Sequence, residues 1–90
     1  MTVRYTANFL KQLKKSNVRM RKAFKERLLL FVKDSRDLEL NNHPLQEEYI
    51  GFRSIDITVD YRAIYKEVTA EDGTYIYFTS FGTHTKLYRQ

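Results

Sequence analysis

Two histidines are the side chains of this sequence that are best suited to proton transfer. His43 stands before the only proline of the chain, and His84 follows a glycine and a threonine. An imidazole gains and loses a proton near neutral pH, so it is the usual general acid or base in catalysis. A lone histidine is more often a surface or capping residue, and the neighbours of these two therefore decide whether chemistry is expected.

Two arginines and two aspartates accompany the histidines. Arg53 and Arg62 lie on either side of a predicted hairpin turn. Asp56 lies on the first strand of that hairpin, and Asp60 lies near its turn. Guanidinium groups present a planar fork that suits phosphate, and carboxylates orient or tune nearby histidines. We expect the four side chains to point toward a common surface, although the aspartates also suit a purely turn-forming, solvent-facing role.

These residue types suffice for RNA cleavage without a metal ion. In that reaction a base removes the proton of the ribose 2′-hydroxyl, which attacks the adjacent phosphate. An acid protonates the leaving oxygen, and cations stabilise the phosphorane. No cofactor is therefore expected. The sequence has no cysteine and only two histidines, a poor set for zinc, and it has no metal-loop spacing of acidic residues, glycine-rich phosphate loop or nucleophile elbow.

Length and charge limit the classes of protein to consider. Ninety residues predict one domain, residues 1–90, with a modest core. The net charge of +5 is concentrated in the first third and makes nucleic acid a candidate partner, although many small basic proteins bind no particular anion. No apolar run approaches membrane-spanning length, and the first ten residues lack a signal-peptide pattern. We expect a cytoplasmic protein without membrane contact.

A short strand and two amphipathic helices are predicted in the first third. The strand covers residues 3–5, and Thr6 is a suitable N-cap for the first helix, which ends at Ser16 and Asn17. The second helix is predicted over residues 18–33. The apolar residues at helical spacing are Phe9, Leu10 and Leu13 in the first helix and Phe24, Leu28, Phe31 and Val32 in the second. We interpret these stripes as core and the basic residues as a solvated side, with partner-binding or phosphate-facing surfaces as the alternatives.

The remainder of the chain has the pattern of antiparallel strands. Residues 49–58 alternate, so Ile55 and Ile57 are predicted to face the helices while Ser54 and Asp56 lie on a polar, open face. Further strands are predicted at residues 61–68, 75–81 and, as a short last strand, 85–88, with a tight turn at Asp72 and Gly73 and a break at Gly82. The fold class is therefore α+β, with two layers: an N-terminal strand, a helix pair, then an antiparallel meander of three or four strands. From the residues alone the sequence indicates only a small basic domain for which RNA binding is one role.

Several of these segments resemble the RelE/YafQ family of type II toxins, and the YafQ branch in particular. The resembling segments are residues 43–46 (HPLQ), 51–53 (GFR), 60–65 (DYRAIY) and 82–84 (GTH), followed by 87–88 (LY). They span about half of the chain. The resemblance implies a RelE/ParE-like fold and a ribosome-dependent endonuclease that cuts mRNA in the ribosomal A site.

The resemblance also assigns catalytic residues by position. His43 matches one catalytic histidine of the YafQ branch, and His84 matches a second, which is the leading candidate for general acid or base. Asp60 matches a catalytic aspartate. Asp56 stands where the YafQ pattern has a third histidine. An aspartate donates a proton poorly at neutral pH, so Asp56 is expected to tune a neighbour, or the proton transfers are divided differently.

Binding residues and partners follow from the same resemblance. Tyr88 matches a C-terminal aromatic residue that positions a base, and Arg53 and Arg62 lie where basic residues of the family meet the phosphate backbone. The implied partners are mRNA on the ribosome, with ribosomal RNA around it, and an antitoxin encoded alongside that covers the pocket or wraps the helices. Operator DNA is an expected partner only of the toxin–antitoxin complex.

Two other functions are compatible with the same fold. One is a ParE-like toxin that poisons DNA gyrase, and the other is a non-catalytic RNA-binding module. The combination of His43, Asp60 and His84 favours the nuclease, because a gyrase poison has no need of this set, and a His84→Ala variant separates the nuclease from a binding module.

Overall fold

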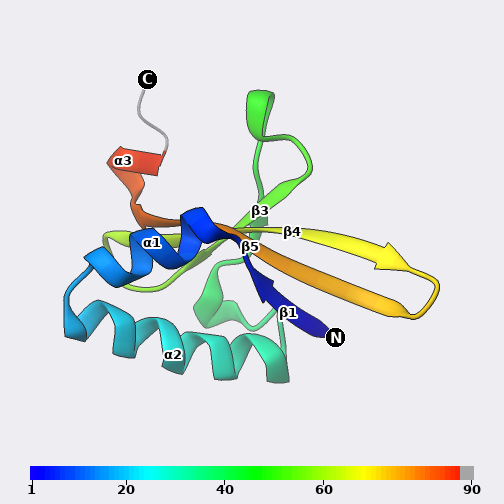
Figure 1. Cartoon of the computed structure of the whole chain (residues 1–90), viewed down its shortest axis with the longest axis horizontal. Coiled ribbons are helices and arrows are strands. Elements are labelled where there is room, and N and C mark those ends of the chain that lie inside the picture. The colour runs from blue at the N-terminus through cyan, green and yellow to red at the C-terminus, as the bar shows by residue number, and fades with distance from the viewer. Residues whose placement is uncertain (88–90) are drawn as a thin grey trace.

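A computed structural model describes residues 1–87 and consists of a five-stranded sheet with two long helices against it (Figure 1). The strands are β1 (Thr2–Tyr5), β2 (His43–Pro44), β3 (Phe52–Asp56), β4 (Tyr61–Ala70) and β5 (Gly73–Thr83). The helices are α1 (Ala7–Lys15), α2 (Val18–Lys33) and α3 (His84–Leu87), with 3₁₀ turns η1 (Leu38–Leu40) and η2 (Glu47–Tyr49). The strand order is β1-β5-β4-β3-β2. The α+β class predicted from the sequence is confirmed.

Strand β1 gives the sheet its mixed character. It pairs in parallel with β5, whereas β2, β3, β4 and β5 are joined by antiparallel pairing. A parallel pair needs a crossover connection, and the helix pair between β1 and the meander provides one. The antiparallel meander was predicted, but the position of β1 at the edge of β5 was not, because no local pattern specifies which strand it joins.

Capping side chains fix where the two helices begin. Thr6 Oγ1 accepts a hydrogen bond from the backbone N–H of Phe9 at 3.1 Å, and Asn17 Oδ1 accepts one from Met20 at 2.9 Å. Each cap satisfies a backbone donor that has no partner inside its helix. Both helices therefore begin and end close to the positions predicted from the sequence, with the break at Ser16.

Helix α1 completes an edge of the sheet that β1 leaves unpaired. Strand β1 ends at Tyr5, while β5 continues beyond it. The side chain of Asn8 donates to the carbonyl of Thr79 at 3.0 Å, and Gln12 Oε1 accepts from the N–H of Phe81 at 2.8 Å. These side chains take the place of a neighbouring strand, so the buried backbone groups of β5 remain hydrogen-bonded.

The core is a cluster of aromatic rings between the helices and one face of the sheet. Phe78 on β5 is at its centre, fully buried, with its ring 5.5–6.0 Å from five other rings. Those rings belong to Tyr5, Phe9, Phe24, Phe31 and Tyr65. The predicted helix stripes are confirmed for the phenylalanines, but Leu10 and Val32 are about half exposed because the helices meet the sheet over a narrower arc.

Two predicted strands have different bounds. The strand predicted at residues 49–58 is confined to β3, because η2 precedes it and Gly51, with a φ of +96°, turns the chain into it. The predicted break at Gly82 is wrong, since β5 continues to Thr83 and Gly82 pairs with Arg62 on β4. The predicted last strand is also wrong: residues 84–87 form α3, and the rest of that range lies outside the described residues.

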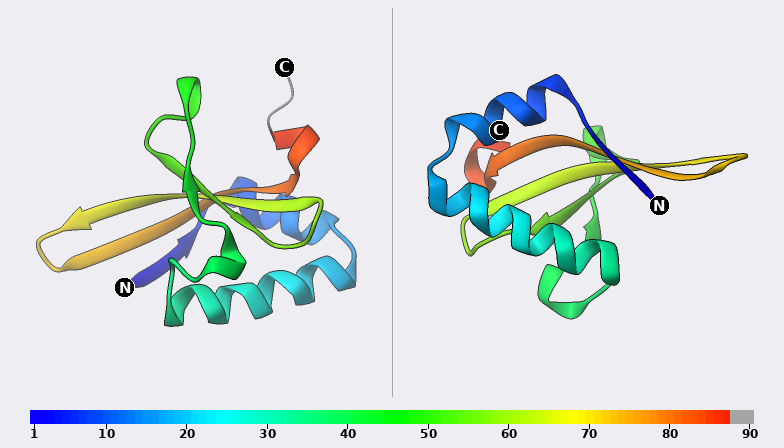
Figure 2. Two further views of the ribbon diagram at one scale, coloured as in Figure 1. Left: turned by 180° about the vertical axis from the view of Figure 1, so that it is seen from behind. Right: turned by 60° about the horizontal axis from the view of Figure 1, so that its bottom comes forward.

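The two sides of the sheet carry different segments. Helix α2 lies on one side, and both the 45–51 segment and α3 lie on the other (Figures 1 and 2). We call the side opposite α2 the far face. It was predicted to be open, yet Ser54 on it is fully buried, so this part of the prediction is wrong. The long β4–β5 hairpin extends beyond the body as an arm (Figure 2). None of the helices within residues 1–87 is long and apolar enough to span a membrane.

Candidate active site

His84 and Asp60 meet at a corner where two turns of the chain come together. The β3–β4 turn carries Asp60, and the junction of β5 with α3 carries His84. The backbone N–H of His84 donates to the carbonyl of Asp60 at 2.9 Å. A hollow of about 330 Å³ opens at this corner, and its lining includes both residues together with Val59, Tyr61, Thr83 and Thr85. The structure thus brings together two candidate residues that are 24 positions apart in the sequence.

Local sequence explains why the chain turns into a helix at His84. Thr83 is the last residue of β5, and its hydroxyl accepts a hydrogen bond from the N–H of Lys86 at 3.2 Å, as an N-cap does. The side chain of Leu87 then packs over Gly82, within 3.5 Å of where a Cβ atom would stand. Tyr49 donates its hydroxyl hydrogen to the carbonyl of Leu87 at 3.1 Å and so ties η2 to α3. These contacts fix the backbone that carries the histidine.

Arg62 holds the turn that carries Asp60. Its Nη1 donates to three carbonyls of the turn, those of Thr58, Val59 and Tyr61, at 2.9–3.2 Å. Its Nε lies 2.9 Å from Oδ1 of Asp56, a contact that does not have hydrogen-bond geometry and is best described as an ion pair. Both side chains are less than a third exposed. Arg62 is therefore a structural clamp as well as a cation near the site.

His43 is positioned by the residue two places before it. Its Nδ1 lies 2.8 Å from the carbonyl oxygen of Asn41. A backbone carbonyl only accepts hydrogen bonds, so Nδ1 carries the hydrogen and Nε2 of the neutral ring keeps its lone pair for a proton. The Asn41 amide also donates to Oδ2 of Asp56 at 3.4 Å. His43 is thus coupled through Asn41 to the Asp56–Arg62 ion pair.

The two histidines lie far apart across the sheet. His43 pairs with Ser54 on β3, and His84 directly follows the end of β5. Three strand spacings separate β2 from β5, which is about 14 Å at roughly 4.8 Å per spacing. Residues directly opposite each other in antiparallel strands share a face, so His43, Asp56 and Arg62 all belong to the far face.

Arg53 does not join this group. It pairs with Tyr65, whose ring is buried in the core, and therefore lies on the side of the sheet opposite Arg62. Its Nε donates to Oδ1 of Asn42 at 2.7 Å, and Asn42 in turn donates to the hydroxyl of Tyr65 at 2.8 Å. The expectation of one common surface for both arginines is wrong. Tyr65, the partner of Arg53, lies three residues from Arg62 along β4, and residues an odd number apart on a strand point to opposite faces. Tyr88 lies outside the described residues.

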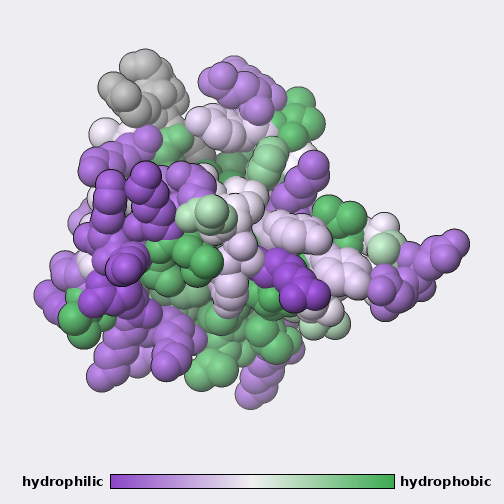
Figure 3. Space-filling model, viewed as in Figure 1, coloured by the Kyte–Doolittle hydropathy of each residue, from purple (hydrophilic) through white to green (hydrophobic). Residues whose placement is uncertain are grey.

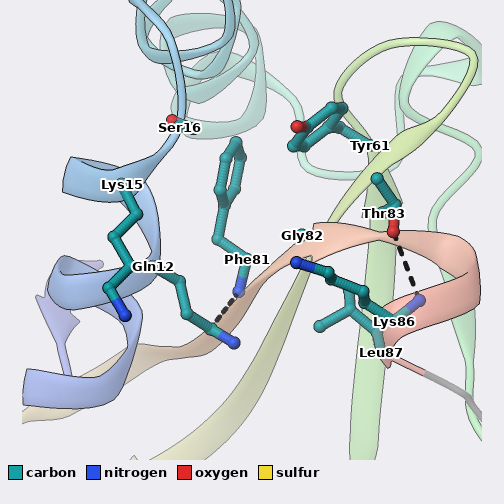
Figure 4. A pocket seen from close by; sticks show the side chains of 9 residues that line it. All are labelled: Gln12, Lys15, Ser16, Tyr61, Phe81, Gly82, Thr83, Lys86 and Leu87. Atoms are coloured by element: carbon teal, nitrogen blue, oxygen red, sulfur yellow. Dashed lines mark hydrogen bonds between the residues drawn. The ribbon is translucent and has the colours of Figure 1, made fainter.

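A second hollow adjoins the corner on the other side of β5. It has a volume of about 180 Å³ and is lined by nine residues from α1, its C-cap, the start of β4, the end of β5 and α3 (Figure 4). Lys15 and Lys86 contribute its two ammonium groups, and the hydrogen bond between Gln12 and Phe81 is part of its wall. The hollow shares Tyr61 and Thr83 with the His84 corner. Two cations thus line the hollow that adjoins the His84 corner.

Asn41 and Tyr49 were not singled out from the sequence. Asn41 adopts a left-handed conformation with a φ of +49°, which asparagine tolerates better than most residues, and this bend directs its carbonyl toward His43. The asparagine pair before the His-Pro dipeptide was the available signal. Tyr49 gave none, since one tyrosine among seven has no distinguishing context. Among residues 1–87 no group of three or more histidine or acidic side chains is placed to hold a metal ion.

Comparisons with known proteins bear on the fold that carries this site. No family model and no curated protein matches the chain. Among solved structures, YafQ from E. coli strain BL21(DE3) is 26% identical, with a TM-score of 0.77 over 96% of each chain. The chain thus has the fold of the RelE/YafQ toxins and is similar in sequence to YafQ.

Solved structures of lower sequence identity share the same fold. A YoeB/ParE toxin from Agrobacterium tumefaciens is 15% identical, with a TM-score of 0.76 over 93% of this chain and 99% of that one. The toxin–antitoxin complex RelBE2 from Mycobacterium tuberculosis is 22% identical, with a TM-score of 0.64 over 92% and 96%. The resemblance to the RelE/YafQ toxins that was stated from the sequence is thereby confirmed.

Proposed function

We propose that the chain is the toxin of a type II toxin–antitoxin system and that it cleaves mRNA in the ribosomal A site without a metal ion. The observation that carries the proposal is the corner formed by His84 and Asp60, with His43 and the Asp56–Arg62 ion pair on the same sheet. This set stands on a scaffold that is 26% identical to YafQ over nearly its whole length. Action on ribosomes implies a cytoplasmic location.

The two histidines are assigned the proton transfers. One imidazole takes the proton of the ribose 2′-hydroxyl, the freed oxygen attacks phosphorus, and the other imidazole protonates the departing 5′-oxygen. Attacking and leaving oxygens lie on opposite sides of phosphorus in an in-line displacement, so acid and base must stand apart. His43 on β2 and His84 at the start of α3 come from separate elements, from which the two rings could approach a phosphate from different sides.

Asp56 and Arg62 are assigned supporting roles. Asp56 is paired with the guanidinium of Arg62 and accepts a hydrogen bond from Asn41, so it is assigned no proton transfer. It positions Arg62 and, through Asn41, the ring of His43. Arg62 stabilises charge on the phosphorane while it holds the turn of Asp60. The third histidine of the YafQ pattern is thus replaced by a residue that organises the site.

Primer extension on a defined mRNA tests the proposal. The mRNA is incubated with the protein in the presence and absence of programmed ribosomes, using wild type, His84→Ala and His43→Ala. Thr85→Ala is the matched control, because it alters the same hollow without removing a proton-transfer group. We expect cuts at A-site codons only with ribosomes, a loss of roughly 10²- to 10⁴-fold for each histidine variant, and little change for the control.

Two results, read together with a growth assay of the same variants, would contradict the proposal. Intact mRNA in every tube, from a protein that still arrests growth, would favour the ParE-like alternative and lead to gyrase supercoiling assays. Growth arrest that persists in the His84→Ala variant would favour a non-catalytic RNA-binding module.

The groove between α1 and α2 is the proposed binding site of the antitoxin. Its volume is about 580 Å³, with an apolar floor and a basic rim. Figure 3 shows an apolar patch there, surrounded by hydrophilic side chains. The floor includes Leu10, Leu13, Phe24 and Leu28, and the rim is formed by Arg21, Lys22 and Lys25. An acidic amphipathic segment complements this surface. RelBE2 is itself a toxin–antitoxin complex on the same fold, and operator DNA is proposed to bind only such a complex.

Co-expression with the antitoxin encoded alongside tests that assignment. The variant Lys22→Glu/Lys25→Glu reverses two rim charges, and Lys11→Glu/Lys33→Glu makes the same change in charge outside the groove. We expect only the first variant to lose neutralisation. Equal loss in both variants would indicate general electrostatic attraction and not a groove-specific contact.

A further inference from the structure

Four side chains form a row across the sheet, one strand after another. Arg4 on β1 pairs with Tyr77 on β5, Tyr77 pairs with Lys66 on β4, and Lys66 pairs with Phe52 on β3. We call these four residues the cross-sheet row. Cations and aromatic rings alternate along it. Residues that pair directly across strands have side chains on the same face, so the four belong to one surface.

The row lies on the far face, away from the helices. The chain neighbours Tyr5, Tyr65 and Phe78 all point into the aromatic core. Successive residues of a strand point to opposite faces, so the row members beside them point outward. Arg4 and Lys66 are exposed, and Tyr77 keeps 37% of its surface exposed. The row therefore shares its face with Asp56 and Arg62.

The rings of this surface are held in place before any ligand arrives. Tyr75 stacks on Tyr77 with ring centroids 6.4 Å apart and planes 24° from parallel. The hydroxyl of Tyr75 donates to Oδ2 of Asp72 at 2.7 Å, which fixes its orientation. Lys66 Nζ lies 5.7 Å from the ring centroid of Phe52, in the range of a cation–π contact. Ordered rings lose little entropy when a planar group stacks on them.

Alternating cations and exposed rings match the chemistry of a single nucleic-acid strand. Ammonium and guanidinium groups attract phosphates, while aromatic rings stack with bases that are free of a partner strand. A duplex hides its base faces and meets only the cations. Asp56 is paired with Arg62, so its charge is compensated. Asp72 accepts from the neutral phenol of Tyr75 and keeps its charge, but it lies in the β4–β5 turn, outside the row. The row itself contributes two exposed cations, Arg4 and Lys66, where a phosphate would approach.

We propose that the cross-sheet row, together with Tyr75, binds single-stranded RNA without sequence preference and guides the substrate strand across the sheet. Phe52 lies four positions before Asp56 on β3, which is about 13 Å. The row thus holds a part of the strand that lies outside the candidate active site. The role in guiding substrate rests on the proposed function, whereas RNA binding by the row does not.

Fluorescence anisotropy with a labelled oligouridine of about twelve nucleotides tests the binding. All proteins carry His84→Ala, so that bound RNA stays intact. Tyr77→Ala removes the exposed ring, and Tyr77→Phe keeps it. We expect affinity to fall about tenfold for Tyr77→Ala and to change little for Tyr77→Phe. The thermal midpoint of each variant checks that folding is retained.

Charge variants separate the row from the general basic surface. Lys66→Gln removes a cation of the row, and Lys22→Gln removes one from the helix side. We expect only Lys66→Gln to weaken binding and to reduce the slope of log affinity against log salt by about one. The same oligomer as a duplex with its complement should bind more weakly and respond equally to Tyr77→Ala and Tyr77→Phe.

Three outcomes would overturn the inference. They are no measurable binding at low salt, wild-type binding by Tyr77→Ala, and equal weakening by Lys22→Gln and Lys66→Gln. Primer extension with the variants in an otherwise wild-type chain keeps this failure distinct from failure of the proposed function. If the row variants leave ribosomal cleavage unchanged, only the guiding role is contradicted. If the protein binds RNA but does not cleave it, only the proposed nuclease is contradicted.

Discussion

The two faces of the sheet are formed by alternate residues of the same strands, yet their physical properties are opposite. On the face toward the helices, Phe78 and Tyr65 are buried in a continuous group of rings. On the far face, one residue away along β4, Lys66 is exposed and Ile64 is covered. The first face has few polar atoms. The second contains the Asp56–Arg62 ion pair, His43 and the cross-sheet row.

This difference separates stability from chemistry within one sheet. Apolar burial contributes most of the free energy of folding and does not depend on exact side-chain orientation. Proton transfer and phosphate binding need polar groups that are held in fixed orientations, often at some cost in stability. Substitutions on the helix-facing side are therefore expected to change unfolding, and those on the far face to change activity first.

The largest effect on stability is expected for Phe78→Ala. This change removes the ring at the centre of the aromatic core and leaves a cavity, which typically lowers the free energy of unfolding by about 3–5 kcal/mol. Ser80→Ala, two residues along β5, alters the far face and should change the free energy of unfolding by less than about 0.5 kcal/mol. Urea denaturation of both variants measures the contrast. Similar losses in the two would show that the faces do not differ in their contribution to folding.

A smaller loss is expected for Arg62→Lys. Lysine keeps the charge but lacks the planar guanidinium that reaches three carbonyls and Asp56. The free energy of unfolding should therefore fall by about 1–2 kcal/mol. Ribosomal cleavage should fall as well, because the turn of Asp60 loosens. Arg27→Lys, in the exposed 3.4 Å pair with Glu39, is the matched control and should change stability by less than about 0.5 kcal/mol. A fully stable Arg62→Lys protein would exclude the clamp role.

Ser54→Ala is expected to stabilise the protein slightly. The Ser54 hydroxyl is fully buried on the far face and lacks a hydrogen-bond partner among the described residues. Replacing it with a methyl-sized side chain relieves the cost of that buried polar group, so we expect a gain of about 1 kcal/mol in urea denaturation. A loss of stability would mean that the hydroxyl is hydrogen-bonded in solution.

The smallest effect concerns the alkaline limit of stability. Burial raises the pKa of the Tyr5 phenol above its ordinary value of 10.0. As pH rises through that value, the unfolded chain releases a proton that the folded chain retains, so stability falls until the folded pKa is passed. Between about pH 9 and about pH 11, the Tyr5→Phe variant should lose less stability than the wild type, as measured by the urea midpoint.

Tyr75 on the far face provides the comparison for that measurement. A hydrogen bond to Asp72, followed by desolvation, raises the pKa of the Tyr75 phenol in the same direction. Because Tyr75 donates to an exposed carboxylate, Tyr75→Phe should have a weaker effect on the alkaline slope than Tyr5→Phe. The reverse order would show that the hydrogen bond outweighs burial.

Local signals in the sequence predicted the elements well. Capping residues at Thr6 and Asn17 specified both helix starts, and the Asp72–Gly73 turn specified the β4–β5 hairpin. Non-local features were missed. The parallel pairing of β1 with β5 depends on a crossover that spans most of the chain. Gly82 was taken as a break, although a glycine that pairs across a strand needs no special backbone conformation.

The geometry of the candidate site followed only partly from the sequence. The family resemblance supplied His43, Asp60 and His84 as candidates; the fold puts His43 on β2 and brings Asp60 and His84 together at the turn-and-helix corner. Arg53 was assigned to the wrong face because its role depends on Asn42, a contact between separate segments. The link from His43 through Asn41 to Asp56 depends on a left-handed residue whose side-chain partner lies on another strand. Such contacts have no periodic signature in the sequence.

The side chains of Asn8 and Gln12 have a consequence for solubility. By donating to and accepting from the backbone of β5, they occupy a strand edge that would otherwise invite pairing with another molecule. At the outer edges, β1 has four residues and β2 has two. Sheets with blocked or short edges offer little template for addition of a strand from a second chain. We therefore expect aggregation through intermolecular β-pairing to be slow, and to accelerate when Gln12 is replaced by a shorter side chain.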